Sequence, residues 1–289
     1  MKTKFQSAEK ILPIFFVLLS WFKYRMINLS HKRGGCVLIS YVFKRFELKY
    51  LLTAEQYRAA RSAVESRLSP DAFGKTTIQS LYYDTPDDRL VRSSIEKPVF
   101  KEKLRLRAYG LSDDDKNIYV EMKRKYDDVV YKRRLACTER EAERMMSGGS
   151  ESQIGRELDY FFKFYGVLSP KILILYDREA FFDSGSALRV TFDQNVRYRK
   201  DNLNLHTSLD GEKLLPNGTV LMEIKSGTAF PLWLCDMLCK EKIKKQSFSK
   251  YGAAYEREYR KNTVSRSNIL CLNPFSAAEP LPQSASLSY

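Results

Sequence analysis

Residues 99–135 read VFKEKLRLRAYGLSDDDKNIYVEMKRKYDDVVYKRRL, and charged and apolar side chains alternate through three runs of this stretch. In the first run Lys103, Arg105 and Arg107 alternate with two leucines. Successive side chains of a strand point to opposite faces, so each run has one cationic and one apolar face. One such strand is typical of any antiparallel sheet with a charged face in water. Three neighbouring cationic strands repel one another, which favours a bound polyanion.

The composition indicates a globular protein with an anionic partner. The 289 residues are 44% hydrophobic and carry a formal net charge of +14, with a pI near 9.4. This charge favours nucleic acid, an acidic membrane surface or a phosphate compound without choosing among them. Five cysteines without a Cys-x-x-Cys pair and two distant histidines argue against a disulfide framework, a thiolate or imidazole metal site and a Ser-His-Asp triad. We therefore expect a reducing cytoplasm and oxygen ligands for any metal.

The two ends of the chain differ from its middle. Residues 11–22 form an apolar run that is shorter than the ~20 residues of a membrane span, and no small-x-small cleavage site follows it. Of three interpretations, an interfacial anchor, an uncleaved signal and an extension outside the fold, we adopt the third for residues 1–40. Residues 262–289 are rich in Ser, Ala and Pro and are predicted to be a disordered tail. The domain is thus predicted to span residues 41–261, with membrane contact through the apolar run left open.

Hydrophobic periodicity and capping signals predict helices and strands along the rest of the chain. Thr53 with Gln56, and Thr138 with Glu141, have capping-box spacing at the starts of two helices. The predicted helices cover about residues 53–68, 138–146, 154–165, 231–245 and 251–261, and further strands cover residues 41–50, 78–83, 171–182, 187–193 and 220–225.

The cationic face recurs on strands throughout the chain. Its basic members are Arg45, Lys49, Lys101, Lys103, Arg105, Arg107, Lys123, Lys125, Lys132, Arg134, Arg178, Arg189 and Lys225, and its acidic members are Glu47, Glu121, Asp193 and Glu223. Surfaces usually intersperse the two signs, and the helices need the apolar face of the sheet to pack on. The predicted fold is therefore α+β, a closed antiparallel β-barrel with a charged lumen and helices outside. Such a lumen suits phosphate chains together with a divalent cation.

Short motifs in a defined order resemble those of a known family. They are Arg45-Phe-Glu47-Leu-Lys49-Tyr50, Ser80-Leu-Tyr-Tyr-Asp84-Thr85, Lys103-Leu-Arg105-Leu-Arg107-Ala-Tyr109, Glu121-Met-Lys123, Tyr131-Lys132-Arg-Arg134, Tyr176-Asp-Arg178-Glu-Ala-Phe, Leu188-Arg189-Val-Thr-Phe-Asp193, Glu223-Ile-Lys225 and Ser249-Lys250-Tyr251. Over about residues 41–261 the chain resembles the VTC (vacuolar transporter chaperone) polyphosphate polymerase domain of the triphosphate tunnel metalloenzyme (CYTH-like) superfamily. The resemblance implies an antiparallel β tunnel that transfers the γ-phosphate of ATP to a growing polyphosphate chain with Mn²⁺ or Mg²⁺.

The same resemblance implies roles for individual residues. The implied catalytic residues are Lys49, Arg105, Arg107, Lys123, Arg178, Arg189 and Glu223. The implied substrate-binding residues are Lys49, Arg105, Arg107, Lys123, Lys132, Arg134, Arg178, Arg189, Lys225, Ser249 and Lys250. Glu223 matches the metal ligand, and Glu47 and Glu121 are further candidates.

The first motif departs from the superfamily pattern Glu-x-Glu-x-Lys because Arg45 replaces the first glutamate. The polymerase branch usually reads this way, and the change removes a carboxylate that could hold a second metal or orient a water. A polymerase is thus favoured over a tunnel triphosphatase that hydrolyses tripolyphosphate or a nucleoside triphosphate. A non-catalytic polyphosphate or nucleic-acid binding module is the third hypothesis. Aromatic residues fall mostly on the apolar face, so we expect ATP and polyphosphate as partners and no nucleic acid.

Overall fold

The computed structural model describes residues 38–43, 46–96, 98–113, 118–126, 129–147 and 153–271, with side chains from residue 46 to residue 261. The chain divides into two compact units, residues 1–38 and 39–289, and the fold described below belongs to the second. Residues 1–37 of the predicted extension 1–40, the position of Arg45, and residues 272–289 of the predicted tail 262–289 lie outside the described residues. The predicted domain limits stay predictions.

Strands and helices follow one another in the α+β arrangement predicted from the sequence. Their order is β1 (Leu38–Phe43), β2 (Phe46–Leu52), α3 (Ala54–Glu65), β3 (Ser69–Pro70), β4 (Thr76–Asp84), α4 (Arg89–Glu96), β5 (Phe100–Tyr109), β6 (Ile118–Tyr126), β7 (Val129–Cys137), α5 (Glu139–Met146), α6 (Gln153–Tyr165), β8 (Ser169–Phe182), β9 (Arg189–Arg199), β10 (Glu212–Lys213), β11 (Val220–Ser226), α7 (Leu232–Lys240) and α8 (Lys250–Cys271).

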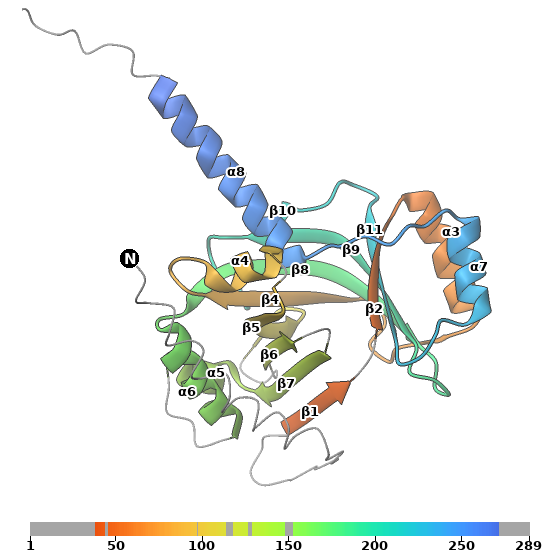
Figure 1. The fold of residues 1–289 in the computed structure, drawn as a ribbon, viewed down its shortest axis with the longest axis horizontal. Coiled ribbons are helices and arrows are strands. Elements are labelled where there is room, and N and C mark those ends of the chain that lie inside the picture. Colours follow the sequence, from red (N-terminus) through yellow and green to blue (C-terminus); the bar gives the residue numbers. More distant parts are fainter. Residues whose placement is uncertain are drawn as a thin grey trace, which may run out of the picture. The chain divides into compact units, whose positions relative to one another are not determined.

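The strands form one eleven-stranded sheet in the order β1-β7-β6-β5-β4-β8-β9-β11-β2, with β3 beside β8 and β10 beside β9 (Figure 1). From β7 to β2 all neighbours are antiparallel. The prediction of a closed barrel is wrong: the hydrogen-bonded path is open, and among the described residues β2 pairs only with β11. Closure depends on the stagger and tilt of the strands, which side-chain alternation does not report. The sheet is nevertheless curled, because Glu47 Oε2 on β2 lies 3.7 Å from Lys123 Nζ on β6.

The three strands predicted from residues 99–135 are confirmed as β5, β6 and β7. In their register Arg105 lies opposite Glu121, and Glu121 lies opposite Arg134. The apolar residues between them, Leu104 and Met122 among them, are buried. The alternation therefore separates a buried apolar face from a charged face, and the charged side chains of the three strands stand beside one another.

Helices α3 and α7 lie side by side at the β2 end of the sheet (Figure 1). The predicted capping box begins α3: Thr53 Oγ1 accepts a hydrogen bond from Gln56 N at 3.3 Å, and Thr53 N donates to Gln56 Oε1 at 3.1 Å. The two helices cover an apolar cluster whose largest buried members include Tyr50, Phe181, Phe192, Met222 and Leu234. Because Tyr50 and Met222 point into this cluster, their neighbours Lys49 and Glu223 point to the opposite, charged face of the sheet.

Helices α4 and α8 meet over a second apolar cluster, which includes Tyr82, Val91, Tyr176 and Tyr251. The rings of Tyr82 and Tyr251 stack with centroids 4.4 Å apart. The Tyr251 hydroxyl donates to the buried Asp84 carboxylate at 2.8 Å. Asp84 also accepts hydrogen bonds from Leu90 N and Val91 N, two of the free N–H groups at the start of α4. One carboxylate thus joins the end of β4 to both helices.

Two helix ends differ from the prediction. Helix α7 stops at Lys240 instead of about Lys245, because Lys242 adopts a φ of 52° and Ile243 N donates to Leu238 O at 2.9 Å. Lys242 N also donates to Cys239 O, so the helix ends in a Schellman motif. This motif usually has glycine where the chain has Lys242, so the sequence did not indicate it. Helix α8 continues to Cys271, beyond its predicted end near Lys261. No helix among the described residues is long and apolar enough to cross a membrane.

Candidate active site

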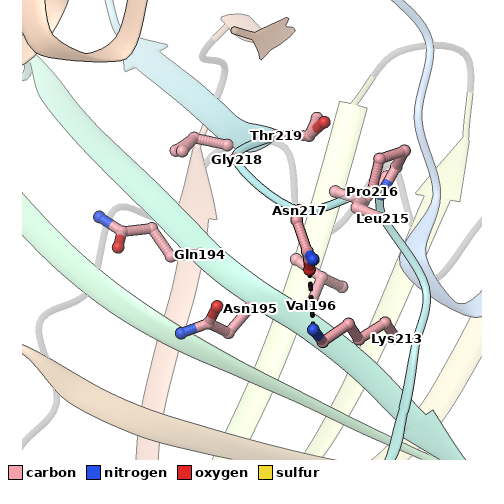
Figure 2. Close-up of a pocket in the computed structure, with 10 residues that line it drawn as sticks. Gln194, Asn195, Val196, Lys213, Leu215, Pro216, Asn217, Gly218 and Thr219 are labelled. Carbon is pink, nitrogen blue, oxygen red and sulfur yellow. Dashed lines mark hydrogen bonds between the residues drawn. The ribbon is translucent and has the colours of Figure 1, made fainter. Parts of the chain in front are cut away.

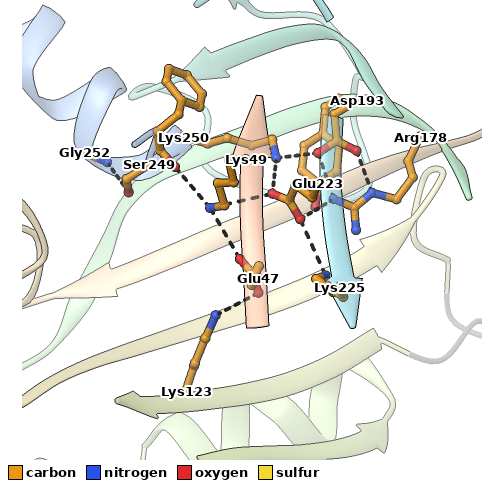
Figure 3. A network of polar contacts seen from close by, with 12 residues as sticks. Glu47, Lys49, Lys123, Arg178, Asp193, Glu223, Lys225, Ser249, Lys250 and Gly252 are labelled. Carbon is orange, nitrogen blue, oxygen red and sulfur yellow. Dashed lines mark hydrogen bonds and ion pairs between the residues drawn. The ribbon is translucent and has the colours of Figure 1, made fainter. Parts of the chain in front are cut away.

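Charged side chains from six elements converge on one face of the curled sheet. Figure 3 shows Lys49 and Glu47 from β2, Glu223 and Lys225 from β11, Arg178 from β8 and Asp193 from β9 pointing toward one another, with Lys250 from α8 and Lys123 from β6 beside them. The alternation of strand side chains positions all of these residues except Lys250, which the docking of α8 adds. Residues far apart in the sequence are thus gathered in one place.

Four cations surround the Glu223 carboxylate, and we call this group with Glu223 the Glu223 cluster. Glu223 Oε1 lies 3.3 Å from Lys250 Nζ and 3.7 Å from Lys49 Nζ. Glu223 Oε2 lies 3.5 Å from both Arg178 Nη2 and Lys225 Nζ. Burial by itself would raise the pKa of Glu223, but the four cations outweigh it and hold this pKa well below the usual range. The carboxylate is therefore ionised, and the cluster keeps an excess of positive charge.

Asp193 fixes the orientation of Arg178. The Arg178 guanidinium donates to both carboxylate oxygens, from Nε to Oδ1 at 2.6 Å and from Nη2 to Oδ2 at 2.7 Å. Lys250 also donates to Asp193, whose side chain is fully buried. A two-point contact of this kind holds a guanidinium plane rigidly. Asp193 thus anchors two cations of the cluster without being at its centre.

Arg105, Arg107, Lys132 and Arg134 surround the buried carboxylate of Glu121, and we call these five residues the Glu121 cluster. The contacts to Glu121 Oε2 are 2.6 Å from Arg105 Nη2 and 3.5 Å from Arg107 Nε, and those to Oε1 are 2.9 Å from Lys132 Nζ and 3.4 Å from Arg134 Nε. Burial would raise the pKa of Glu121, but Arg105, Arg107 and Lys132 hold it well below the usual range. Burial, with repulsion from Arg105 and Arg107, lowers the pKa of Lys132 to about 7 despite the attraction of Glu121. One negative charge thus faces three arginines and a lysine that is partly charged at neutral pH.

Tyr176 lies between the two clusters. Its hydroxyl accepts a hydrogen bond from Arg107 Nη2 at 3.4 Å, and its ring lies 4.4 Å from Lys250 Nζ and 5.0 Å from the Arg178 guanidinium carbon. Burial would raise the pKa of this phenol, but Arg107, Arg178 and Lys250 lower it overall. One buried side chain therefore contacts cations of both clusters, which makes the two clusters adjacent.

Several buried polar atoms on this face lack a hydrogen-bond partner among the described residues. They include Ser80 Oγ and Thr191 Oγ1, and also Arg107 Nε and Arg134 Nε, whose ion-pair contacts with Glu121 at 3.5 and 3.4 Å do not have hydrogen-bond geometry. Ser80 lies opposite Arg107 and Thr191 lies opposite Glu223 in the strand register. Buried polar groups without hydrogen bonds cost stability, so a water or a polar ligand on this face would stabilise them.

The carboxylates of the site can be compared with the requirements of a divalent cation. The described residues contain no group of three or more His, Cys, Asp or Glu side chains placed to hold a metal. Magnesium-like ions usually take one or two carboxylates together with substrate phosphates, so two suffice. Glu223 fits, because its contacts are 3.3 Å or longer and no short hydrogen bond occupies its oxygens. Glu47, which contacts Lys49 at 3.5 Å, lies beside it, whereas Glu121 is 2% exposed and held at 2.6 Å by Arg105.

Three of the predicted substrate-binding residues contact neither Glu223 nor Glu121. Lys123 lies 3.7 Å from Glu47. Arg189 Nη2 donates to Asp71 Oδ2 at 2.6 Å in the loop before β4, although its strand position matches the charged face. Ser249 Oγ accepts from Lys103 Nζ at 3.2 Å. The roles that the resemblance implies for these residues stay predictions.

Sequence reasoning placed Lys103 and Asp193 on the charged face without giving them a role in the site, and it did not place Tyr82 and Tyr176 there. Tyr82 lies opposite Arg105, and its hydroxyl accepts from Arg105 Nη1 at 2.8 Å. A signal was present for Tyr82 and Tyr176, because each stands at an even spacing from a charged-face residue, Ser80 or Arg178. Their contacts with cations of other strands depend on how the strands pair, which the sequence alone does not indicate.

A small pocket of about 80 Å³ lies away from both clusters. Figure 2 shows it between Gln194, Asn195 and Val196 of β9 and the segment 213–220, where Lys213 Nζ donates to Asn217 Oδ1 at 2.8 Å. No residue of either cluster lines it. It holds little charge and is not a candidate for the polyanion.

Lys103 predicts a pH dependence of anion binding. Burial, together with Lys123, Lys49 and Arg105, lowers the pKa of Lys103 to about 7. A bound anion favours the protonated amine, so binding takes up protons above pH 7 and weakens as pH rises through that value. We expect the dissociation constant for tripolyphosphate to rise between pH 6 and pH 8.5, measured by isothermal titration calorimetry.

The matched variant for this measurement is Lys103→Arg, because a guanidinium stays charged throughout the range. The dissociation constant of this variant for tripolyphosphate should change less with pH than that of the wild type. Because tripolyphosphate titrates identically in both experiments, the difference between the two proteins reports the protein alone. Equal slopes would show that Lys103 does not titrate on binding.

Three solved structures illustrate what this chain is similar to. One is a putative adenylate cyclase from Vibrio parahaemolyticus, at 13% identity and a TM-score of 0.42, covering 73% of this chain and 97% of that chain. The second is a putative adenylate cyclase from Bacillus halodurans, at 10% identity and a TM-score of 0.47, covering 72% and 95%. The third is a putative adenylyl cyclase from Hippeastrum, described as having a dominant triphosphatase activity, at 14% identity and a TM-score of 0.42, covering 71% and 92%.

No curated protein matches the chain. A family model described as the VTC domain matches residues 44–259, a range that contains both clusters and Tyr176. Since this match spans more than half of the 289 residues, the protein belongs to the VTC domain family.

Proposed function

We propose that the protein is a metal-dependent polyphosphate polymerase that transfers the γ-phosphate of ATP to a growing polyphosphate chain. Membership of the VTC domain family supports an enzyme that acts on triphosphates. Arg45, at the position of a glutamate in the wider superfamily, supports transfer to phosphate over transfer to water.

The observation that carries the proposal is the pair of cation clusters joined by Tyr176. Each cluster has four cations around one carboxylate, so each can hold a separate polyanionic segment. A hydrolase needs one such segment and a water, whereas a polymerase needs a donor and an acceptor side by side. Holding two anionic reactants in one orientation removes much of the entropic barrier to their reaction.

Positioning and charge stabilisation are sufficient for phosphoryl transfer, which needs little covalent chemistry from the protein. The terminal oxygen of the acceptor chain, already ionised at neutral pH, forms a bond to the γ-phosphorus. The bond from that phosphorus to the β–γ bridging oxygen breaks, and ADP leaves with the electron pair. Arg105 and Arg107 on one side and Arg178 and Lys250 on the other hold the phosphates and neutralise the charge that develops.

Glu223 and Glu47 would hold the divalent cation together with substrate oxygens, and the ion would supply charge neutralisation on the transferring phosphates. Glu47 is available at any working pH. Burial would raise its pKa, but Lys123 and Lys225 outweigh this effect and lower it to about 2.

We expect the purified protein, given ATP and Mn²⁺ or Mg²⁺, to make ADP and a ladder of polyphosphate. A gel stained for polyphosphate, run beside an assay for free phosphate, measures both products. Added long-chain polyphosphate should compete with ATP at low salt and less so as salt screens the clusters. Stoichiometric free phosphate without a ladder would identify a triphosphatase, and the absence of both products would leave a binding module.

A further inference from the structure

Phe73 is an aromatic side chain left in solvent beside the charged face. It lies in the loop between β3 and β4 and is 77% exposed. Its ring faces that of Tyr109 at an angle of 23°, with centroids 6.5 Å apart, near the long limit for a stacked pair. The ring therefore gains little from the protein, while one of its faces remains free to stack.

The loop that carries Phe73 is held firmly in place. Asp71 N donates to Ala180 O at 2.8 Å, and Asp71 Oδ1 accepts from Phe73 N at 2.8 Å. Asp71 Oδ2 accepts from Arg189 Nη2 at 2.6 Å, and Thr76 Oγ1 donates to Phe73 O at 2.8 Å. The exposure of the ring is thus a feature of an ordered loop.

A continuous set of contacts leads from this ring to the Glu121 cluster. Phe73 faces Tyr109, the Tyr109 hydroxyl accepts from Arg134 Nη2 at 2.9 Å, and Arg134 Nε lies 3.4 Å from Glu121. The Arg134 guanidinium also stacks 3.6 Å from the Tyr119 ring centre. Arg107 in the same cluster is 7% exposed and lies 3.5 Å from Glu121. The exposed ring is therefore connected through Tyr109 and Arg134 to a cluster in which four basic side chains surround one carboxylate.

We propose that Phe73 is the stacking platform for the base of a nucleoside triphosphate whose phosphates bind the Glu121 cluster. The proposal rests on the proposed function, because it concerns the donor of the same reaction. A base and a chain of phosphates are the two ends of a nucleotide, and the platform and the cluster match them in that order. Stacking on an aromatic ring accepts any base, so the platform selects nucleotides over inorganic phosphate chains without selecting one base.

Another exposed aromatic residue, Phe164, offers a control for the proposed stacking on Phe73. Phe164 on α6 is 51% exposed and packs edge-on against Tyr165 with centroids 4.8 Å apart. It belongs to neither cluster, and none of the contacts of the charged face involves it. Phe164→Ala is therefore a matched control for Phe73→Ala.

The test compares the dissociation constants of ATP and tripolyphosphate for the full-length protein, by calorimetry at one metal concentration and one salt concentration. Phe73→Ala should weaken ATP binding by about 5- to 100-fold, the range that stacking of one base supplies. The same variant should leave tripolyphosphate binding within about 2-fold, since this ligand has no base. Phe73→Trp should restore ATP binding, and Phe164→Ala should change neither constant.

The outcomes separate the two proposals. Equal weakening of ATP and tripolyphosphate in Phe73→Ala, or no weakening of either, would overturn the platform and leave the proposed function standing. A wild-type protein that binds neither ligand would overturn both. Because Phe73 is so exposed, we expect each variant to melt at the wild-type temperature, which differential scanning calorimetry verifies.

Discussion

Arg107→Ala is expected to lower kcat by about 100- to 1,000-fold at saturating ATP and metal, the effect of removing one preorganised donor that stabilises charge in a transition state. Arg107 is 7% exposed and contacts Glu121 and Tyr176. Three cations remain around Glu121 after the change, so the carboxylate stays compensated. The melting temperature should therefore stay close to that of the wild type, since the change also relieves repulsion from Arg105.

Two variants control this result. Arg107→Lys should recover only part of the activity, because an ammonium group cannot make the two-point contact of a guanidinium. Arg124→Ala removes an arginine from β6, on the opposite face, where it pairs with Glu102 and Glu157. It should lower stability and leave the kcat of the folded protein unchanged. Wild-type turnover in Arg107→Ala would remove this residue from the site.

Glu223→Gln is expected to abolish metal-dependent turnover, with at least about a 100-fold loss that excess metal does not rescue. The amide keeps the size of the side chain and removes its charge. The same change should tighten metal-free binding of tripolyphosphate in the presence of EDTA, because it removes an internal anion that competes for Lys49, Lys225 and Lys250. Activity and metal-free affinity thus move in opposite directions.

Glu179→Gln is the matched control, since Glu179 follows Arg178 on β8 and pairs with Arg61 at 2.8 Å on the other face. It should change neither measurement. If Glu223→Gln weakened metal-free binding of tripolyphosphate, the Glu223 carboxylate would hold the lysines in position for the ligand and would not compete with the ligand for them. If it kept full turnover, the metal would be held elsewhere.

The local part of this structure was readable from the sequence. Alternation placed Arg105, Arg107 and Glu121 on one face because strand geometry turns every second side chain the same way. Capping residues located the starts of α3 and α5 for a similarly local reason. The order of the motifs led to the right family, with the match over residues 44–259.

Long-range relations were not readable in the same way. Closure of the sheet was predicted wrongly. Alternation of side chains describes a single strand, and it does not tell whether the edge strands β1 and β2 pair with each other. Arg189 has the spacing of a charged-face residue, yet Asp71 from a separate loop takes its guanidinium. The division of the cations into two clusters depends on which strands are neighbours, and the register that decides this is a property of the whole fold.

The hydrogen bond from Tyr251 to Asp84 bears on when the site is completed during synthesis. Every described strand of the sheet precedes residue 249, whereas Lys250 and Tyr251 belong to α8, which follows all of these strands along the chain. Chains fold progressively from the amino end as they emerge. A nascent chain can therefore pair all its strands while Asp193 and Glu223 still lack the Lys250 ammonium. Only when α8 docks on Asp84 and Tyr82 does the Lys250 ammonium reach Asp193 and Glu223, so the strands can pair before the site is complete.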